Sequence, residues 1–111
     1  MFFSEGKAIY ASQEASTYPH LDYLLESYFH QDFDIFGNTL AEVIAKYTED
    51  ESESERRGTI SDIHRFLEQY GQTNDSLAGA LERVFKPGVI IEGWEGLTSS
   101  QWLGKIARLL A

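Results

Sequence analysis

The chain has 111 residues but no cysteine and only two prolines. Without cysteine it can form no disulfide, no Cys-based zinc site and no thiol nucleophile. Long hydrophobic runs are also absent, since the longest, such as residues 88–91, fall far short of the roughly 20 apolar residues that span a bilayer. The N-terminus carries Glu5 where a secretory signal would carry cations. We therefore expect a cytoplasmic protein without a membrane segment.

Positive charge is scarce as well. Nine Lys and Arg residues stand against eighteen Asp and Glu residues, which gives a formal net charge of -9. Binding to nucleic acid or to an anionic lipid surface requires clustered cations, so the composition disfavours both kinds of partner. The acids are densest at residues 49–55. This acidic run contains Glu49, Asp50, Glu51, Glu53 and Glu55.

The acidic run has two interpretations. Consecutive like charges repel one another, so the run is typical of a solvated loop or of a frayed helix end that aids solubility. Alternatively, it is a patch that steers a basic protein partner and raises its association rate. On the second interpretation all five acids are candidate partner-binding residues, with Asp32 and Asp34 as weaker candidates. Tyr23 is a further candidate, because an exposed tyrosine beside aspartate is a common interface anchor.

Apolar residues recur at helical spacing in five segments, which predicts an all-α fold: a compact single-domain bundle of about five short amphipathic helices. The first helix begins at Pro19 and ends near Gln31. Its apolar face consists of Leu21, Leu24, Leu25, Tyr28 and Phe29. The third helix begins near Thr59 or Ser61, and Gly71 ends it in the left-handed conformation. Residues 1–111 form one predicted domain, with an irregular N-terminal arm at 1–17 and a long loop at 86–97.

Local motifs mark the starts of the other three helices. The second and fifth helices begin with capping boxes, in which Thr39 and Thr98 are followed three residues later by Glu42 and Gln101. Asn74 is the predicted N-cap of the fourth helix, because asparagine readily accepts a hydrogen bond from the amides of a first turn.

The sequence offers little for catalysis. The three histidines are His20, His30 and His64. A zinc site from His30, Asp32 and His64 is conceivable, but no His-x-x-x-His pair supports it, and histidines bonded to backbone or carboxylates are the favoured interpretation. Asp32 and Asp34 flank Phe33 in a turn, where solvated carboxylates are favoured over an acid–base pair. No Gly-rich phosphate loop or Gly-x-Ser-x-Gly motif is present. We predict no enzyme activity, no metal and no cofactor.

One segment resembles a known family. Residues 18–34 read YPHLDYLLESYFHQDFD. They resemble the signature of small immunity proteins from bacterial contact-dependent growth inhibition systems, in which Pro-x-Leu-x-x-Leu is followed, after a spacer, by Tyr-Phe-His-Gln-Asp-Trp. Phe33 stands where that family usually has tryptophan. The turn at residues 37–39 and the helix at Trp102-Leu103 are similar in layout.

The resemblance implies a cytoplasmic, non-enzymatic protein that binds the C-terminal domain of one cognate toxin and protects the producing cell. Toxins of such systems are often nucleases, so the implied partner is a basic nuclease domain, bound in a one-to-one complex by stoichiometric occlusion. An acidic helical adaptor for another basic protein remains the alternative. A small metal-dependent enzyme that uses His30 and Asp32 is a third, less favoured one.

Overall fold

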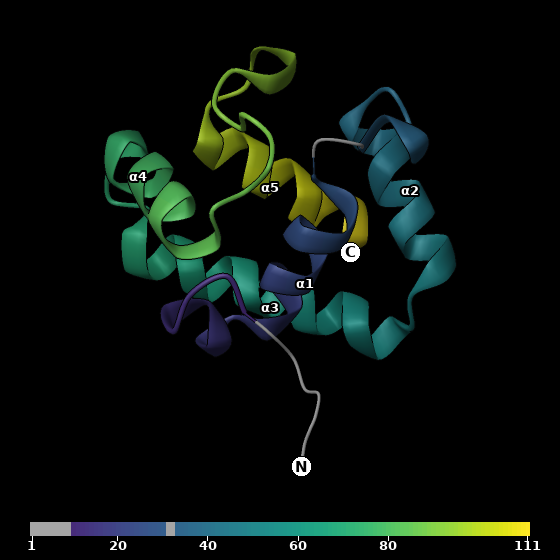
Figure 1. Cartoon of the computed structure of the whole chain (residues 1–111), viewed down its shortest axis with the longest axis horizontal. Helices are drawn as coiled ribbons and strands as arrows, with labels where there is room; N and C mark the ends of the chain where they lie inside the picture. Colours follow the sequence, from purple (N-terminus) through teal and green to yellow (C-terminus); the bar gives the residue numbers. More distant parts are fainter. Residues whose placement is uncertain (1–9, 31–32) are drawn as a thin grey trace.

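The computed structural model describes residues 10–30 and 33–111 (Figure 1). Every regular element in this part of the chain is helical, which confirms the all-α prediction. The α-helices are α1 (Pro19–Tyr28), α2 (Leu40–Asp50), α3 (Glu53–Tyr70), α4 (Asn74–Phe85) and α5 (Ser99–Leu110). Short 3-10 turns are η2 (Glu14–Thr17), η3 (Phe33–Ile35) and η4 (Trp94–Gly96). Within these bounds, no helix combines the length and apolar character that a membrane crossing requires.

Helix α1 packs mainly along α3 and also contacts α2 and α4, whereas α5 packs against α2, α3 and α4. Helices α2 and α4 lie on opposite sides of the molecule (Figure 1). The predicted apolar face of α1 is confirmed, because all five of its side chains are at most 5% exposed. The opposite face of α1 carries the exposed Tyr23 and Glu26, and it forms one side of the candidate site.

Phe29 holds the long loop against the helices. Its ring packs edge-on against Trp94 of that loop and Trp102 of α5, with centroid separations of 5.6 and 5.1 Å. Glu95 adds polar contacts, since its carboxylate accepts a 2.7 Å hydrogen bond from the Leu40 amide and lies 3.1 Å from Lys105 Nζ. The loop thereby joins the start of α2 to α5.

Both predicted capping boxes are present, at Thr39 and at Thr98. The predicted cap of the fourth helix is wrong by one residue. The N-cap is Thr73, whose extended backbone lets its hydroxyl accept from the Ser76 amide at 3.1 Å. Asn74 is already helical, and its side chain instead contacts Glu92 at 3.0 Å.

Two predicted helix ends are wrong. Helix α1 ends at Tyr28 rather than near Gln31, because the Phe29 backbone leaves the helical region with φ -120° and ψ 54°. Gly71 ends α3, but its φ of -86° is not left-handed. Glycine suits this position for a different reason: a Cβ there would overlap the Leu67 carbonyl oxygen.

Helix α3 begins at Glu53, six residues or more before the predicted start. Ser52 caps it by accepting a 3.0 Å hydrogen bond from the Glu55 amide. Carboxylates in a first turn interact favourably with the helix dipole, and Glu53 forms a 2.6 Å ion pair with Arg57 one turn later. The acidic run is therefore not a loop or a frayed end. It is the last turn of α2, a two-residue connection and the first turn of α3.

Of the predicted irregular arm at 1–17, residues 1–9 lie outside the described part of the chain. Residues 14–17 form η2, and Ala15 within it is fully buried.

Candidate functional site

Two tyrosines of α1 meet the acidic run where α2 gives way to α3. One oxygen of the Glu51 carboxylate accepts hydrogen bonds from the Tyr23 hydroxyl at 2.7 Å and the Tyr28 hydroxyl at 2.8 Å. The Tyr28 hydroxyl also lies 3.4 Å from an Asp50 oxygen. We call Tyr23, Tyr28, Asp50 and Glu51 the tyrosine–carboxylate cluster. Three of its four members are candidates predicted from the sequence.

The cluster is closely packed on its inner side and open to solvent on its outer side. The Tyr28 side chain is buried, and its ring packs against Tyr47 and Phe36 with centroids 5.2 and 4.9 Å away. Tyr23 is 40% exposed. The hydrogen bond to Glu51, together with burial, raises the pKa of Tyr23 to about 12, so its hydroxyl stays a donor at neutral pH. The cluster thus presents an oriented aromatic ring beside negative charge.

A second pair lies between the same helices. His20 Nδ1, in the first turn of α1, is 3.0 Å from Glu55 Oε1, in the first turn of α3. Gly58 makes room for it, since a Cβ at Gly58 would lie 2.5 Å from His20 Cδ2. For His20, the favoured interpretation of a histidine bonded to a carboxylate is confirmed. The other Glu55 oxygen, Oε2, is buried and has no hydrogen-bond partner among the described residues.

Asp62 fixes the start of α1 on α3. This buried carboxylate accepts hydrogen bonds from the amides of His20 at 2.8 Å and Leu21 at 3.1 Å, and it pairs with Arg65. The first turn of α1 lacks a side-chain cap of its own from Tyr18, so Asp62 satisfies amides that would otherwise have no partner. Asp62 therefore determines where the His20 and Tyr23 side chains stand.

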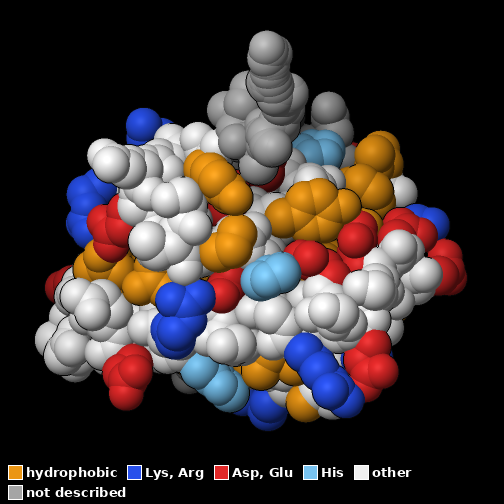
Figure 2. Space-filling view, turned by 90° about the horizontal axis from the view of Figure 1, so that it is seen from below, with side chains coloured by type: hydrophobic (Ala, Val, Ile, Leu, Met, Phe, Trp, Pro, Cys, Tyr) orange, Lys and Arg blue, Asp and Glu red, His pale blue; other side chains and the backbone are white. Residues whose placement is uncertain are grey.

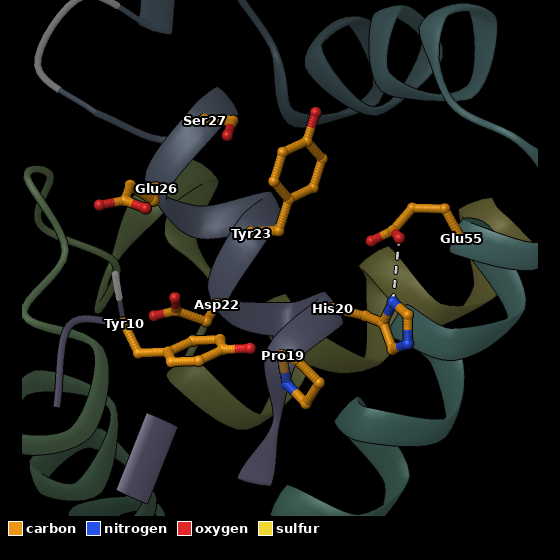
Figure 3. Close-up of a pocket in the computed structure, with 8 residues that line it drawn as sticks. All are labelled: Tyr10, Pro19, His20, Asp22, Tyr23, Glu26, Ser27 and Glu55. Carbon is orange, nitrogen blue, oxygen red and sulfur yellow. Dashed lines mark hydrogen bonds and ion pairs between the residues drawn. The ribbon is translucent and has the colours of Figure 1, made fainter. Parts of the chain in front are cut away.

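A pocket of about 440 Å³ opens beside these groups (Figure 3). It is lined by Tyr10, Pro19, His20, Asp22, Tyr23, Glu26, Ser27 and Glu55. Asp22 is only 4% exposed. Burial raises its pKa to about 6, an effect that the Ala11 backbone amide partly offsets and the nearby Glu26 charge reinforces. No pattern in the sequence indicates Asp22 as a functional residue.

The remaining candidates predicted from the sequence lie apart from the tyrosine–carboxylate cluster or outside the described residues. Glu49 and Glu53 are exposed and pair with Lys46 and Arg57 at 3.2 and 2.6 Å. Asp34 is exposed in η3, which lies by the N-terminal end of α2, whereas the acidic run begins at its C-terminal end (Figure 1). Asp32 lies outside the described residues.

Acidic, aromatic or aliphatic, and histidine side chains lie next to one another near the centre of the face shown in Figure 2. No three His, Asp or Glu side chains of the described part are grouped closely enough to hold a metal ion. The absence of a metal or cofactor stays a prediction, as does a partner-binding role for each candidate residue.

Comparisons with known proteins place the chain in a family. A family model described as CdiI immunity protein matches residues 17–110. A search of curated proteins finds no match. The crystal structure of a CdiA-CT/CdiI complex from Y. kristensenii 33638 contains a chain that is 30% identical to this one, with a TM-score of 0.75. The matched region covers 86% of this chain and 95% of that chain. This chain belongs to the CdiI immunity protein family.

Proposed function

We propose that this protein binds the cognate CdiA-CT toxin domain and neutralises it in a one-to-one complex, without catalysing a reaction itself. The observation that carries the proposal is the likeness, over 86% of the chain, to a chain of a CdiA-CT/CdiI complex. The match of the immunity family model to residues 17–110 supports it independently. If the protein neutralises the toxin by binding it, protection should depend on the molar ratio of this protein to the toxin domain and not on the time for which the two are mixed.

The charge of the chain favours a basic partner surface. A net charge of -9 attracts cationic proteins over a distance of about one Debye length, roughly 8 Å at physiological ionic strength. A nuclease needs cations to hold phosphates, so acidic side chains suit such a surface. We therefore propose a basic nuclease domain as the partner and the bacterial cytoplasm as the place where the two meet.

We propose the tyrosine–carboxylate cluster as the anchor of the interface. Tyr23 combines a large exposed ring with a hydroxyl already held by Glu51, so little conformational freedom is lost when a partner covers it. Exposed acids at the rim, such as Glu49 and Glu53, contribute little affinity on their own but set orientation and association rate. The anchor and the rim therefore have separable effects.

Co-expression with the toxin domain encoded beside the gene tests the proposal. Cells that produce the toxin domain alone should stop growing, whereas cells that also produce this chain should grow, and an affinity-tagged toxin domain should retain the chain at a one-to-one ratio. A toxin domain from an unrelated system serves as the specificity control. Growth arrest in cells that accumulate both cognate proteins would refute the proposal.

Neutralising the rim acids should slow association more than it weakens the complex. We expect the double variant Glu49→Gln, Glu53→Gln to associate about 3 times more slowly at low salt and nearly normally at high salt, where steering is screened. Stopped-flow kinetics at several salt concentrations measures this effect.

The matched control removes the same charge elsewhere. Glu68→Gln and Glu82→Gln neutralise exposed acids of the end of α3 and of α4, away from α2. Equal slowing by both double variants would show that total charge, and not the acidic run, steers the partner.

A further inference from the structure

The pocket beside α1 has aromatic walls. The rings of Tyr10 and Tyr23 are 37% and 40% exposed, and they stand on opposite sides of the pocket in Figure 3. The ring of Pro19 adds further apolar surface to the lining. Tyrosine faces attract cations electrostatically and stack on planar groups, so these walls suit a flat cation better than a compact, strongly hydrated one.

The described lining of the pocket also carries an excess of negative charge. Three carboxylates line it, from Asp22, Glu26 and Glu55, together with one histidine, and no lysine or arginine stands among its described lining residues. Only 4% of Asp22 is exposed, and none of the ion pairs of the described part includes it. A buried carboxylate without a cationic partner destabilises the folded chain.

One carboxylate oxygen of Glu55 also lacks a partner. Its Oε1 is bonded by His20, but its Oε2 is buried and lacks a hydrogen-bond donor among the described residues. Buried polar atoms in native proteins nearly always have a partner, so an orphaned carboxylate oxygen beside an open pocket points to a donor that arrives from outside. Figure 3 shows the Glu55 carboxylate on the side of the pocket that holds His20, across from Asp22 and Glu26.

We infer that this pocket receives the side chain of one arginine of the partner protein, with Glu55 and Asp22 as its counter-charges and Tyr10 and Tyr23 as its stacking faces. A guanidinium group is planar, always charged and carries five N–H donors, so it satisfies Glu55 Oε2 and stacks on a tyrosine ring in the same pose. The inference rests on the proposed function, because the toxin domain supplies the arginine.

Burial makes this contact stronger than the rim contacts. The rim acids are exposed and already paired with Lys46 and Arg57, so an incoming cation gains little there. In the pocket, a complex would seal two incompletely paired carboxylates away from water, where charge-assisted hydrogen bonds are strongest. The pocket should therefore determine the dissociation rate, whereas the rim determines the association rate.

The test compares charge removal inside and outside the pocket. Glu55→Gln and Asp22→Asn should each raise the dissociation constant for the purified toxin domain about tenfold or more. Glu53→Gln removes the same charge from the same helical turn but outside the pocket, and it should change the constant by about twofold or less. Unchanged affinity in both pocket variants, with normal binding by the unmodified chain, would overturn the inference and leave the proposed function intact.

The folding of the free variants separates a binding role from a structural one. Asp22→Asn removes a buried charge without a cationic partner, and Glu55→Gln removes a charge whose Oε2 lacks a donor but keeps an amide oxygen for His20, so urea denaturation at neutral pH should find neither variant less stable than the unmodified chain. A variant that binds more weakly but folds at least as well has lost a contact with the partner. Weaker binding accompanied by a matching loss of stability would overturn the inference, since Glu55 or Asp22 would then act only through the fold.

A double-mutant cycle identifies the occupant. Each arginine of the toxin domain is changed to alanine, and each variant is measured with the unmodified chain and with Glu55→Gln. One arginine should show strong non-additivity, whereas the others should be additive. If none couples, the inference is wrong. If Glu55→Gln instead couples to Lys7→Ala in the stability of the free chain, the pocket belongs to the N-terminal segment of this chain, which also overturns the inference. A toxin domain that the unmodified chain does not bind would refute the proposed function as well.

Discussion

Replacing Phe29 with alanine is expected to lower the free energy of unfolding by about 3–5 kcal/mol. The side chain is fully buried, and its ring packs edge-on against both Trp94 and Trp102, whose centroids are themselves 6.0 Å apart. Alanine would lose the transfer free energy of the ring and would leave a cavity beside two large aromatic groups that cannot close around it fully. The two edge-on ring contacts would disappear as well.

The loss should extend beyond the cavity. Trp94 belongs to the long loop, and the next residue, Glu95, accepts the hydrogen bond from the Leu40 amide at the start of α2. Without Phe29 the loop loses its aromatic anchor, so that bond and the Lys105 contact should weaken too. Hydrogen exchange of the Leu40 amide would detect this local opening.

Urea denaturation followed by circular dichroism measures the total effect. Ile35→Ala is the matched control, because Ile35 is a large apolar side chain that is 72% exposed. Its removal should change stability by no more than about 0.5 kcal/mol. A loss of less than about 1 kcal/mol for Phe29→Ala would contradict the packing described here.

Structural features that depend only on neighbouring residues in the chain could be predicted from the sequence. The apolar face of α1 follows from a spacing of three and four residues, and all five predicted members are buried. The capping boxes at Thr39 and Thr98 are four-residue motifs that act within one turn, and both form. Such signals do not depend on how the helices later pack.

The predicted start of α3 is wrong although its signal is also local. Repulsion among consecutive acids favours one solvated block, but Ser52 divides the acidic run between two helices. Ser52 followed three residues later by Glu55 is a common helix start, and acids there face the positive end of the helix dipole. Like charges are tolerated because a cap, a dipole and the Arg57 ion pair offset their repulsion.

The site could be predicted only in part. Tyr23 was identified as an exposed aromatic and Glu51 as a member of the acidic run, but their hydrogen bond joins residues 28 positions apart. That bond exists because α1 lies across α3, which no local pattern specifies. No sequence pattern indicates that Asp22 belongs to the site. It lies outside the apolar face of α1, and its burial depends on other parts of the chain, including the amide of Ala11.

Asp22→Asn is expected to stabilise the free protein above about pH 6. In the folded chain, burial raises the pKa of this carboxyl from an ordinary 3.8 to about 6, so the folded state holds the proton more tightly than the unfolded chain does. By linkage, the Asp22 contribution falls as pH rises from about 4 to about 6 and is constant above that range. The asparagine variant lacks the titration, so its stability relative to the unmodified chain should increase by about 2–3 kcal/mol from pH 4 to pH 7.

The measurement is the difference in unfolding free energy between the two proteins at pH 4, 5, 6 and 7, in which groups common to both cancel. Glu26→Gln supplies a graded control. This variant removes the neighbouring charge but leaves Asp22 buried. The pH-dependent change in stability that Asp22 causes should therefore become smaller but should not disappear. A difference that stays constant with pH would show that Asp22 is well solvated in the folded chain. A pH-dependent change of the expected size would mean that the free protein retains a destabilising buried carboxylate. If the Asp22→Asn variant is more stable but also binds the toxin domain more weakly, the stability lost through Asp22 serves recognition of the partner.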